Sequence, residues 1–158
     1  METILKSGQE APDFLLQDKD GEFYSLDNFQ GHYLVLYFYP KDLTSGCTIE
    51  AKDFSKLQKE FGKESAIIVG ISKDSIQSHQ QFTDKAKLSI FLFSDPQAEV
   101  HKKYGVWQPR KFMGREFLGT VRSTFLIDPN GKILEIWNDV KVKGHAEEVL
   151  KRLKEMKR

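Results

Sequence analysis

A short stretch around residue 40 constrains the fold more than any other part of the chain. An unbroken apolar run, YLVLYF, extends from Tyr33 to Phe38. Such a run is typical of a strand that is covered on both faces of a sheet. Pro40 ends the run because proline has no backbone N–H to donate to a neighbouring strand. The pattern therefore predicts a buried strand followed by a loop.

A helix is predicted to follow this loop. Thr44 or Ser45 can cap its N-terminus, and Gly62 is its expected end. Its inward-facing stripe is formed by Ala51, Phe54, Leu57 and Phe61. The only cysteine of the chain, Cys47, is thereby placed in the first helical turn.

The position of Cys47 favours a thiolate, but only by a limited amount. Unpaired N–H groups and the positive end of the helix dipole stabilise an anion there. A free cysteine has a pKa of ~8.5, so keeping it mostly ionised at neutral pH requires roughly 3 kcal/mol. A helix terminus supplies about 0.3–1 kcal/mol, or ~2 kcal/mol when partly buried. A nearby cation is therefore also required, and arginine is the best choice because it keeps its charge.

The arginines that could supply this cation are Arg110, Arg115, Arg122, Arg152 and Arg158. Arg152 and Arg158 are expected on the solvated face of a C-terminal helix. Arg122 opens a predicted strand directly after an irregular stretch, so its side chain can be aimed into a cleft. A surface salt bridge is an equally good interpretation of Arg122 taken alone.

A lone cysteine is more often a small buried apolar residue than a nucleophile. The surrounding sequence reverses this balance. Pro40, Thr44 and Cys47 form the pattern P-x-x-x-T-x-x-C across the strand, loop and helix. This pattern resembles the active-site motif of peroxiredoxins, which are thiol peroxidases with a thioredoxin-like fold. The longer run YFYPKDLTSGCTIEA is similar to the bacterioferritin-comigratory protein, or peroxiredoxin Q, branch of that family.

The resemblance extends over nearly the whole chain. GTVRSTFLID, residues 119–128, is similar to the segment that carries the catalytic arginine of this branch, and the match falls at Arg122. Further similar segments are residues 8–14, 25–31, 71–75, 78–79, 104–106 and 144–145.

The resemblance implies a thiol-dependent peroxidase that reduces hydrogen peroxide and organic hydroperoxides. The Cys47 thiolate attacks the hydroperoxide and becomes a sulfenic acid. In this family the Thr44 hydroxyl contacts substrate and thiolate, Arg122 stabilises both, and Pro40 shields the thiolate from water. Backbone groups at Gly46 and Cys47 donate to a peroxide oxygen, which stabilises developing negative charge.

Glu50 has two compatible interpretations. It follows Cys47 by three residues, so it can return to the same helix face and pair with Arg122 to orient it. It can equally be an acid of the first helical turn, favoured by the helix dipole.

Two positions depart from the pattern of the branch. Ser45 stands where proline usually precedes the Gly-Cys pair. The places where many members carry a second, resolving cysteine hold Lys52 and Thr83, and whether a cysteine once occupied either place stays open. Oxidised Cys47 is therefore expected to need an external reductant: thioredoxin, glutaredoxin or a small thiol.

Other functional classes are less well supported. A thiol-disulfide oxidoreductase needs Cys-x-x-Cys, whereas this chain has Cys47-Thr-Ile-Glu50. A peroxide sensor without turnover, or a holdase, on the same fold remains the alternative function.

Composition excludes several further classes. A net charge of +1, from 24 basic and 23 acidic residues, gives no field for nucleic acid. The four histidines (His32, His79, His101 and His145) lack metal-ligand spacing, so neither a metal nor a cofactor is expected. No apolar run is long enough to cross a membrane, and the N-terminus has no signal-peptide pattern. We expect one domain over residues 1–158, in the cytoplasm, as a monomer or alternatively a dimer.

The remaining patterns complete an α/β, thioredoxin-like fold: a central mixed sheet flanked by helices, with an N-terminal β-hairpin extension. Further strands are predicted at residues 11–16, 22–26, 66–72, 90–93, 123–128 and 132–137. Helices are predicted at residues 75–88, 96–104 and 144–157. Asp74 with Gln77 resembles a capping box. Residues 106–120 show no clear period and predict a functional loop or an irregular strand.

Overall fold

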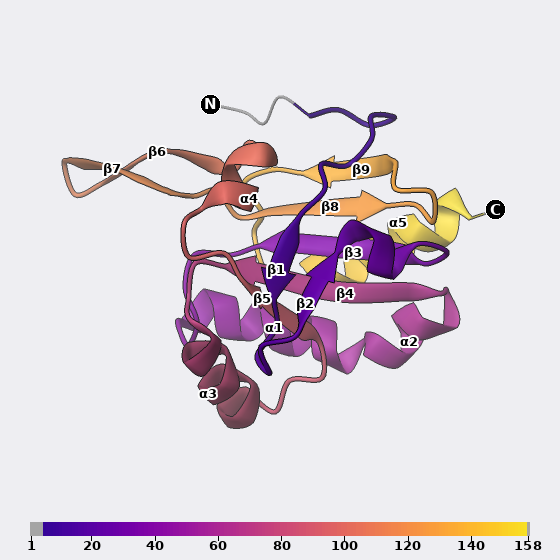
Figure 1. Ribbon diagram of the computed structural model, residues 1–158, viewed down its shortest axis with the longest axis horizontal. Coiled ribbons are helices and arrows are strands. Elements are labelled where there is room, and N and C mark those ends of the chain that lie inside the picture. Colours follow the sequence, from indigo (N-terminus) through magenta and orange to yellow (C-terminus); the bar gives the residue numbers. More distant parts are fainter. Residues whose placement is uncertain (1–4, 158) are drawn as a thin grey trace.

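A seven-stranded mixed sheet forms the centre of the molecule (Figure 1). The structure is a computed structural model, and its description covers residues 5–157. The central strand β3 (Tyr33–Phe38) pairs in parallel with β4 (Ala66–Ser72), and β4 pairs in parallel with β5 (Phe91–Ser94). On its other side β3 pairs antiparallel with β8 (Ser123–Ile127), which pairs antiparallel with β9 (Ile133–Trp137).

The N-terminal hairpin continues the sheet beyond β5. It consists of β1 (Leu15–Gln17) and β2 (Phe23–Ser25), and β1 also pairs antiparallel with β5. The predicted hairpin extension is confirmed, although β1 begins at Leu15 rather than Ala11. Together these pairings confirm the predicted mixed α/β fold.

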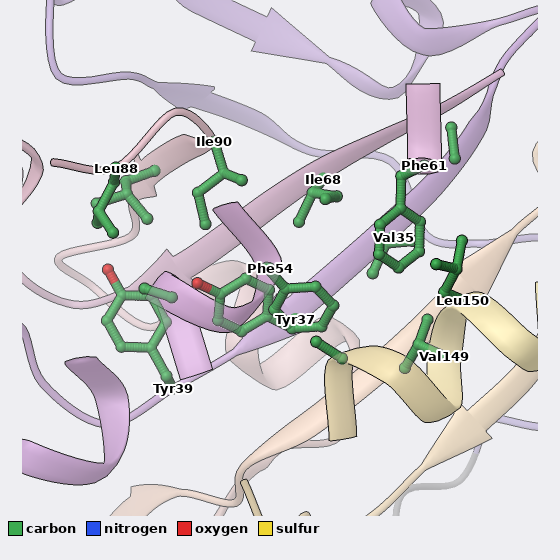
Figure 2. Close-up of a cluster of buried hydrophobic side chains, with 14 of the residues drawn as sticks. Val35, Tyr37, Tyr39, Phe54, Phe61, Ile68, Leu88, Ile90, Val149 and Leu150 are labelled. Carbon is green, nitrogen blue, oxygen red and sulfur yellow. The ribbon is translucent and has the colours of Figure 1, made fainter. Parts of the chain in front are cut away.

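The central strand is buried on both faces, as its unbroken apolar run predicts. Val35 and Tyr37 point into one core, which Figure 2 shows in close-up. Leu36 and Phe38 belong to a second core on the opposite face. Because successive side chains of a strand alternate between faces, a continuous apolar run is what two covered faces require.

Helices cover both faces of the sheet. Side chains of α1 (Ser45–Lys56), α2 (Gln58–Lys63), α3 (Ile76–Ala86) and α5 (His145–Met156) share the core of Val35 and Tyr37. The short helices η1 (Leu26–Phe29) and α4 (Glu99–Lys103) contribute Phe29 and Val100 to the other core.

The helix that carries Cys47 is shorter than predicted. It ends at Lys56, turns at Leu57 and resumes as α2, in which Gly62 is an interior residue rather than the end. The turn lies between Phe54 and Phe61, whose ring centroids are 6.0 Å apart and which are both fully buried. The predicted inward-facing stripe is therefore buried as expected, but it spans two helices rather than one.

Two predicted helix starts are also shifted. Ser75, not Asp74, caps α3, because its hydroxyl accepts a hydrogen bond from the Ser78 N–H. Helix α4 begins at Glu99 rather than Pro96, and the Asp95 carboxylate accepts hydrogen bonds from N–H groups of its first turn.

Residues 106–120 form a regular hairpin, so the prediction of an irregular stretch was wrong. Strand β6 (Trp107–Phe112) pairs antiparallel with β7 (Arg115–Thr120), and the hairpin projects from the body of the molecule (Figure 1). Its turn residues, Met113 and Gly114, have φ angles of 50° and 77°. Positive φ at both central positions is typical of the two-residue turn that joins the strands of a hairpin. Asn-Gly or Asp-Gly is the usual sequence of this turn, so Met113 makes the turn hard to predict from the sequence.

Candidate active site

Cys47 lies in the first turn of α1, as predicted. Its side chain is only 2% exposed, so the sulfur is sheltered from bulk water. Arg122 precedes β8 and donates a hydrogen bond from Nη2 to the sulfur over 3.3 Å. The sheet is what brings them together, because α1 follows β3 and Arg122 precedes the adjacent strand β8.

The guanidinium of Arg122 bridges two acceptors. Its Nη1 donates to Glu50 Oε1 over 2.6 Å while Nη2 contacts Cys47. Burial opposes the charge of Arg122, but Glu50 and Cys47 outweigh burial, so its pKa lies above the ordinary value. Gly46 lies beside this group, since a Cβ at Gly46 would stand 3.4 Å from Nη2, about the distance of an ordinary contact.

Glu50 is a buried carboxyl, and only one of its two oxygens has a hydrogen-bond partner among the described residues. Its side chain is 1% exposed, and Oε2 has no hydrogen-bond partner within residues 5–157. Burial raises the pKa of Glu50 to about 7, even though Arg122 favours the ionised form. Because α1 begins at Ser45, Glu50 falls after the first turn, and the interpretation as a first-turn acid is wrong.

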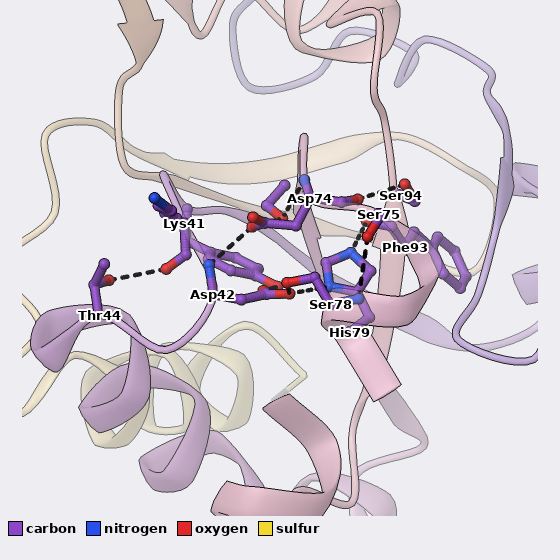
Figure 3. Close-up of polar contacts among 11 residues, drawn as sticks. Lys41, Asp42, Thr44, Asp74, Ser75, Ser78, His79, Phe93 and Ser94 are labelled. Atoms are coloured by element: carbon purple, nitrogen blue, oxygen red, sulfur yellow. Dashed lines mark hydrogen bonds and ion pairs between the residues drawn. The ribbon is translucent and has the colours of Figure 1, made fainter. Parts of the chain in front are cut away.

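Thr44 and Pro40 lie on the loop before α1, and within residues 5–157 neither is hydrogen-bonded to Cys47. Thr44 occupies the N-cap position, yet its hydroxyl donates to the Lys41 carbonyl oxygen over 2.8 Å (Figure 3). Pro40 is exposed and lines a cleft on the outer side of the loop. The structure therefore groups Cys47 with Arg122, and the catalytic roles of Thr44 and Pro40 stay predictions.

The other described arginines do not contact the Cys47 sulfur. Arg110 and Arg115 are on the projecting hairpin, and neither contacts Cys47. Arg152 pairs with Glu135 on the surface over 2.9 Å. Arg158 lies outside the described residues. The contact with the sulfur thus selects Arg122 among the described arginines.

A buried cluster around Asp42 was missed by the sequence analysis (Figure 3). Asp42 Oδ1 accepts a hydrogen bond from the Tyr39 hydroxyl over 2.6 Å. Its Oδ2 lies 2.9 Å from the Ser78 hydroxyl and 2.7 Å from His79 Nδ1. The backbone N–H of Asp42 donates to Asp74 Oδ2 over 2.8 Å. The loop before Cys47 is therefore fastened to α3.

The hydrogen bonds of His79 fix the proton count of this cluster. His79 Nε2 lies 3.0 Å from the Phe93 carbonyl oxygen, which can only accept, so Nε2 carries a proton. Nδ1 faces the Asp42 carboxyl, so one further proton lies between them. The pair is consequently neutral as a whole, which lets it be buried without a net charge.

Two signals in the sequence pointed to this cluster. Asp42 lies inside the YPKD part of the motif, and His79 belongs to one of the short segments that resemble the branch. The pairing itself joins residues 37 positions apart, and no local pattern encodes it.

Tyr37 is a second buried polar group beside the site. Its hydroxyl has no hydrogen-bond partner within the described residues. Burial, with the charges of Glu50 and Cys47, raises its pKa well above the ordinary value, so the phenol stays protonated. Gly70 on the neighbouring strand is required here, since a Cβ would lie 2.8 Å from the Tyr37 ring.

The two places expected for a resolving cysteine carry no sulfur. Lys52 is an exposed residue of α1. Thr83 lies in α3 one turn beyond His79, with its hydroxyl oxygen buried. Cys47 is a free cysteine.

Comparison with known proteins decides the family. The model of the AhpC/TSA family matches residues 7–136, which is most of the chain. The chain belongs to this family. Peroxiredoxin Bcp of Bacillus subtilis is 43% identical over 152 residues, covering 96% of this chain and 97% of the relative.

Solved structures place the chain in the peroxiredoxin Bcp/PrxQ branch. The bacterioferritin comigratory protein of Xanthomonas campestris superposes with a TM-score of 0.90 at 38% identity, covering 99% of this chain and 100% of that one. A cysteine-to-serine mutant of Xylella fastidiosa PrxQ gives a TM-score of 0.93 at 35% identity, with 98% of both chains covered. Within residues 5–157 no helix is long and apolar enough to cross a membrane.

Proposed function

We propose that this protein is a thiol-dependent peroxidase that reduces hydrogen peroxide and organic hydroperoxides at Cys47. The observation that carries the proposal is the 3.3 Å hydrogen bond from Arg122 to the Cys47 sulfur at a helix N-terminus. A fixed positive charge and the helix dipole together favour a thiolate, which is the reactive form of cysteine. The peroxiredoxin relatives support the same chemistry.

The reaction is a displacement at oxygen. The Cys47 thiolate attacks the terminal oxygen of the hydroperoxide, an S–O bond forms and the O–O bond breaks. The sulfur is oxidised to sulfenic acid, and the leaving oxygen takes a proton to become water or an alcohol. Arg122 stabilises the negative charge as it moves from sulfur to oxygen, and Glu50 holds the guanidinium in place.

The loop residues are proposed to complete the peroxide site. Thr44 reaches the substrate only after its hydroxyl leaves the Lys41 carbonyl oxygen, a single hydrogen bond of 2.8 Å. Backbone N–H groups at Gly46 and Cys47 are unpaired at the start of α1 and are proposed to donate to a peroxide oxygen. Pro40 is proposed to limit water access to the loop.

A peroxide sensor or holdase on the same fold is not favoured. The Xanthomonas campestris relative is described by its alkyl peroxide reduction activity, which is turnover. Steady-state peroxide consumption in the presence of excess thiol separates the two functions, because a sensor stops after one equivalent.

The reductant is proposed to be external, namely a thioredoxin, a glutaredoxin or a small thiol, because the chain has one cysteine. A reducing compartment suits an enzyme that depends on free thiols, so the cytoplasm is the proposed location. A monomer is the proposed state, with a dimer as the alternative, and light scattering distinguishes them.

Intact-mass spectrometry after one equivalent of peroxide tests the function. We expect the mass of one added oxygen on Cys47, and a mixed disulfide once a small thiol is added. Rapid, complete formation of a Cys47-linked dimer at dilute protein would contradict reduction by an external thiol. An unoxidised protein would contradict the peroxidase function itself.

A further inference from the structure

A cleft with concentrated positive charge lies on the outer side of the loop before Cys47. It has a volume of about 640 Å³, within the range of small-ligand sites. One wall comes from the loop and the start of the segment after β4, and the other comes from the projecting hairpin. Residues on these walls include Pro40, Lys41, Lys73, Trp107, Arg110 and Phe117.

Three cations line this cleft without carboxylate partners. Lys41, Lys73 and Arg110 form no ion pair with any residue between 5 and 157. The carboxylate in the lining, Asp74, already accepts hydrogen bonds from the Ser72 hydroxyl and the Asp42 N–H. Since the whole chain has a net charge of only +1, the cleft is a local concentration of positive charge.

The cleft also offers apolar surface. Lys73 Nζ lies 4.6 Å from the centroid of the Trp107 ring, which holds the ammonium at the cleft wall. Phe117 and Leu118 expose 50% and 58% of their surface beside it. Such a surface suits a small molecule that combines anionic groups with a short apolar skeleton.

We propose that this cleft binds a small anionic thiol that reduces oxidised Cys47. The inference rests on the proposed peroxidase function, which requires a thiol from outside the chain. Cys47, Thr44 and Arg122 do not line the cleft, so the thiol site is separate from the peroxide site. The wall shared by the two sites is the loop at Pro40 and Lys41. Because Asp42 fastens this loop to α3, opening of the first turn of α1 is the step that exposes the sulfur to a thiol held in the cleft.

The chemistry balances with two thiols. The first thiol attacks the sulfenic acid, so that a mixed disulfide forms and water leaves. The second thiol attacks the mixed disulfide, which releases a small-molecule disulfide and restores Cys47. Both electrons come from the two thiols, and no other reductant is needed.

The test compares three thiols that share a two-carbon skeleton. They are 2-mercaptoethanesulfonate, 2-mercaptoethanol and cysteamine, which carry negative, no and positive charge. Sulfenate is first formed with one equivalent of peroxide, and its reduction rate is measured with each thiol at low and high salt. Wild type is compared with the double variant Lys73→Glu/Arg110→Glu, so the intrinsic reactivity of each thiol cancels.

We expect the double variant to lower the ratio of the anionic to the neutral rate by roughly tenfold at low salt, because each reversal acts on a surface charge contact. High salt is expected to reduce the wild-type preference for the anionic thiol. The matched control is Lys52→Glu/Lys56→Glu, which reverses two exposed charges outside this cleft. It is expected to leave the ratio almost unchanged.

Equal changes in Lys52→Glu/Lys56→Glu and in Lys73→Glu/Arg110→Glu would overturn the inference, because the effect would then be one of overall charge. Absence of any charge preference, with reduction only by a thioredoxin-like protein, would overturn it as well. Failure of sulfenate to form would instead refute the peroxidase function, so the two failures are distinguishable.

Discussion

Two buried carboxyl groups, Asp42 and Glu50, lie on either side of Cys47 in the sequence, and their surroundings differ. Asp42 is surrounded by donors from Tyr39, Ser78 and His79, and it shares a proton with the histidine. Glu50 has one oxygen on Arg122 and one without a partner in the described chain. A satisfied cluster rigidifies a structure, whereas a half-satisfied carboxyl costs stability. The comparison supports Asp42 as the residue that holds the loop, and it supports our proposal that Glu50 acts on the Cys47 sulfur through Arg122.

The largest effect is expected for Cys47→Ser. Serine is similar in size but stays un-ionised at neutral pH, so peroxide consumption should be lost while the fold and the Asp42 cluster remain. Peroxidase assays with circular dichroism measure both. Substantial activity in this variant would show that the peroxidase reaction does not take place at Cys47, beside Arg122 and Glu50.

Arg122→Ala should come next. Removal of the charge that contacts the sulfur should slow peroxide attack by about 10²–10³-fold, the usual cost of one charge-stabilising donor. Arg110→Ala and Arg115→Ala are matched controls for the peroxide step, since neither residue contacts Cys47. Stopped-flow measurement of the peroxide reaction in the three variants measures the effect, and an unchanged rate for Arg122→Ala would refute the assignment.

Asp42→Ala tests the other side of the comparison. It leaves His79 buried without its carboxyl partner, and breaking a buried pair costs about 3–5 kcal/mol of unfolding free energy. Chemical denaturation measures this loss, with Asp84→Ala as an exposed control on α3, the helix that carries His79. A loss no greater than that of the control would mean that the cluster does not hold the loop.

The smallest effect concerns pH. Burial raises the pKa of Glu50 from 4.5 to about 7, so the folded state binds an extra proton between these values. Stability from this group is present below pH 4.5 and is lost as pH rises through about 7. At about 1.36 kcal/mol per unit, the loss is up to about 3 kcal/mol.

Glu50→Gln should remove this pH dependence because an amide does not titrate. Denaturation curves of the variant and the wild type across the same pH range check it. Parallel pH dependence in both proteins would show that the loss comes from other groups.

Local patterns in the sequence determined much of the framework. The apolar run at Tyr33 to Phe38 specified a strand with two covered faces, and Pro40 specified where it ends. The two cap candidates, Thr44 and Ser45, placed Cys47 in the first turn of α1, although the Thr44 hydroxyl forms no capping hydrogen bond. These features depend on neighbours within one turn or one strand, so the sequence alone contains them.

The tertiary structure decided which distant residues meet. Arg122 and Cys47 are 75 positions apart, and Asp42 and His79 are 37 apart. The sequence selected Arg122 only through a family resemblance, and it missed the proton shared by Asp42 and His79. Burial sets the ionisation of Glu50 and appears only once the sheet and helices are packed together. The physical reason is that charge, solvation and hydrogen-bond partners are properties of the assembled surroundings, whereas strand and helix patterns are properties of the chain.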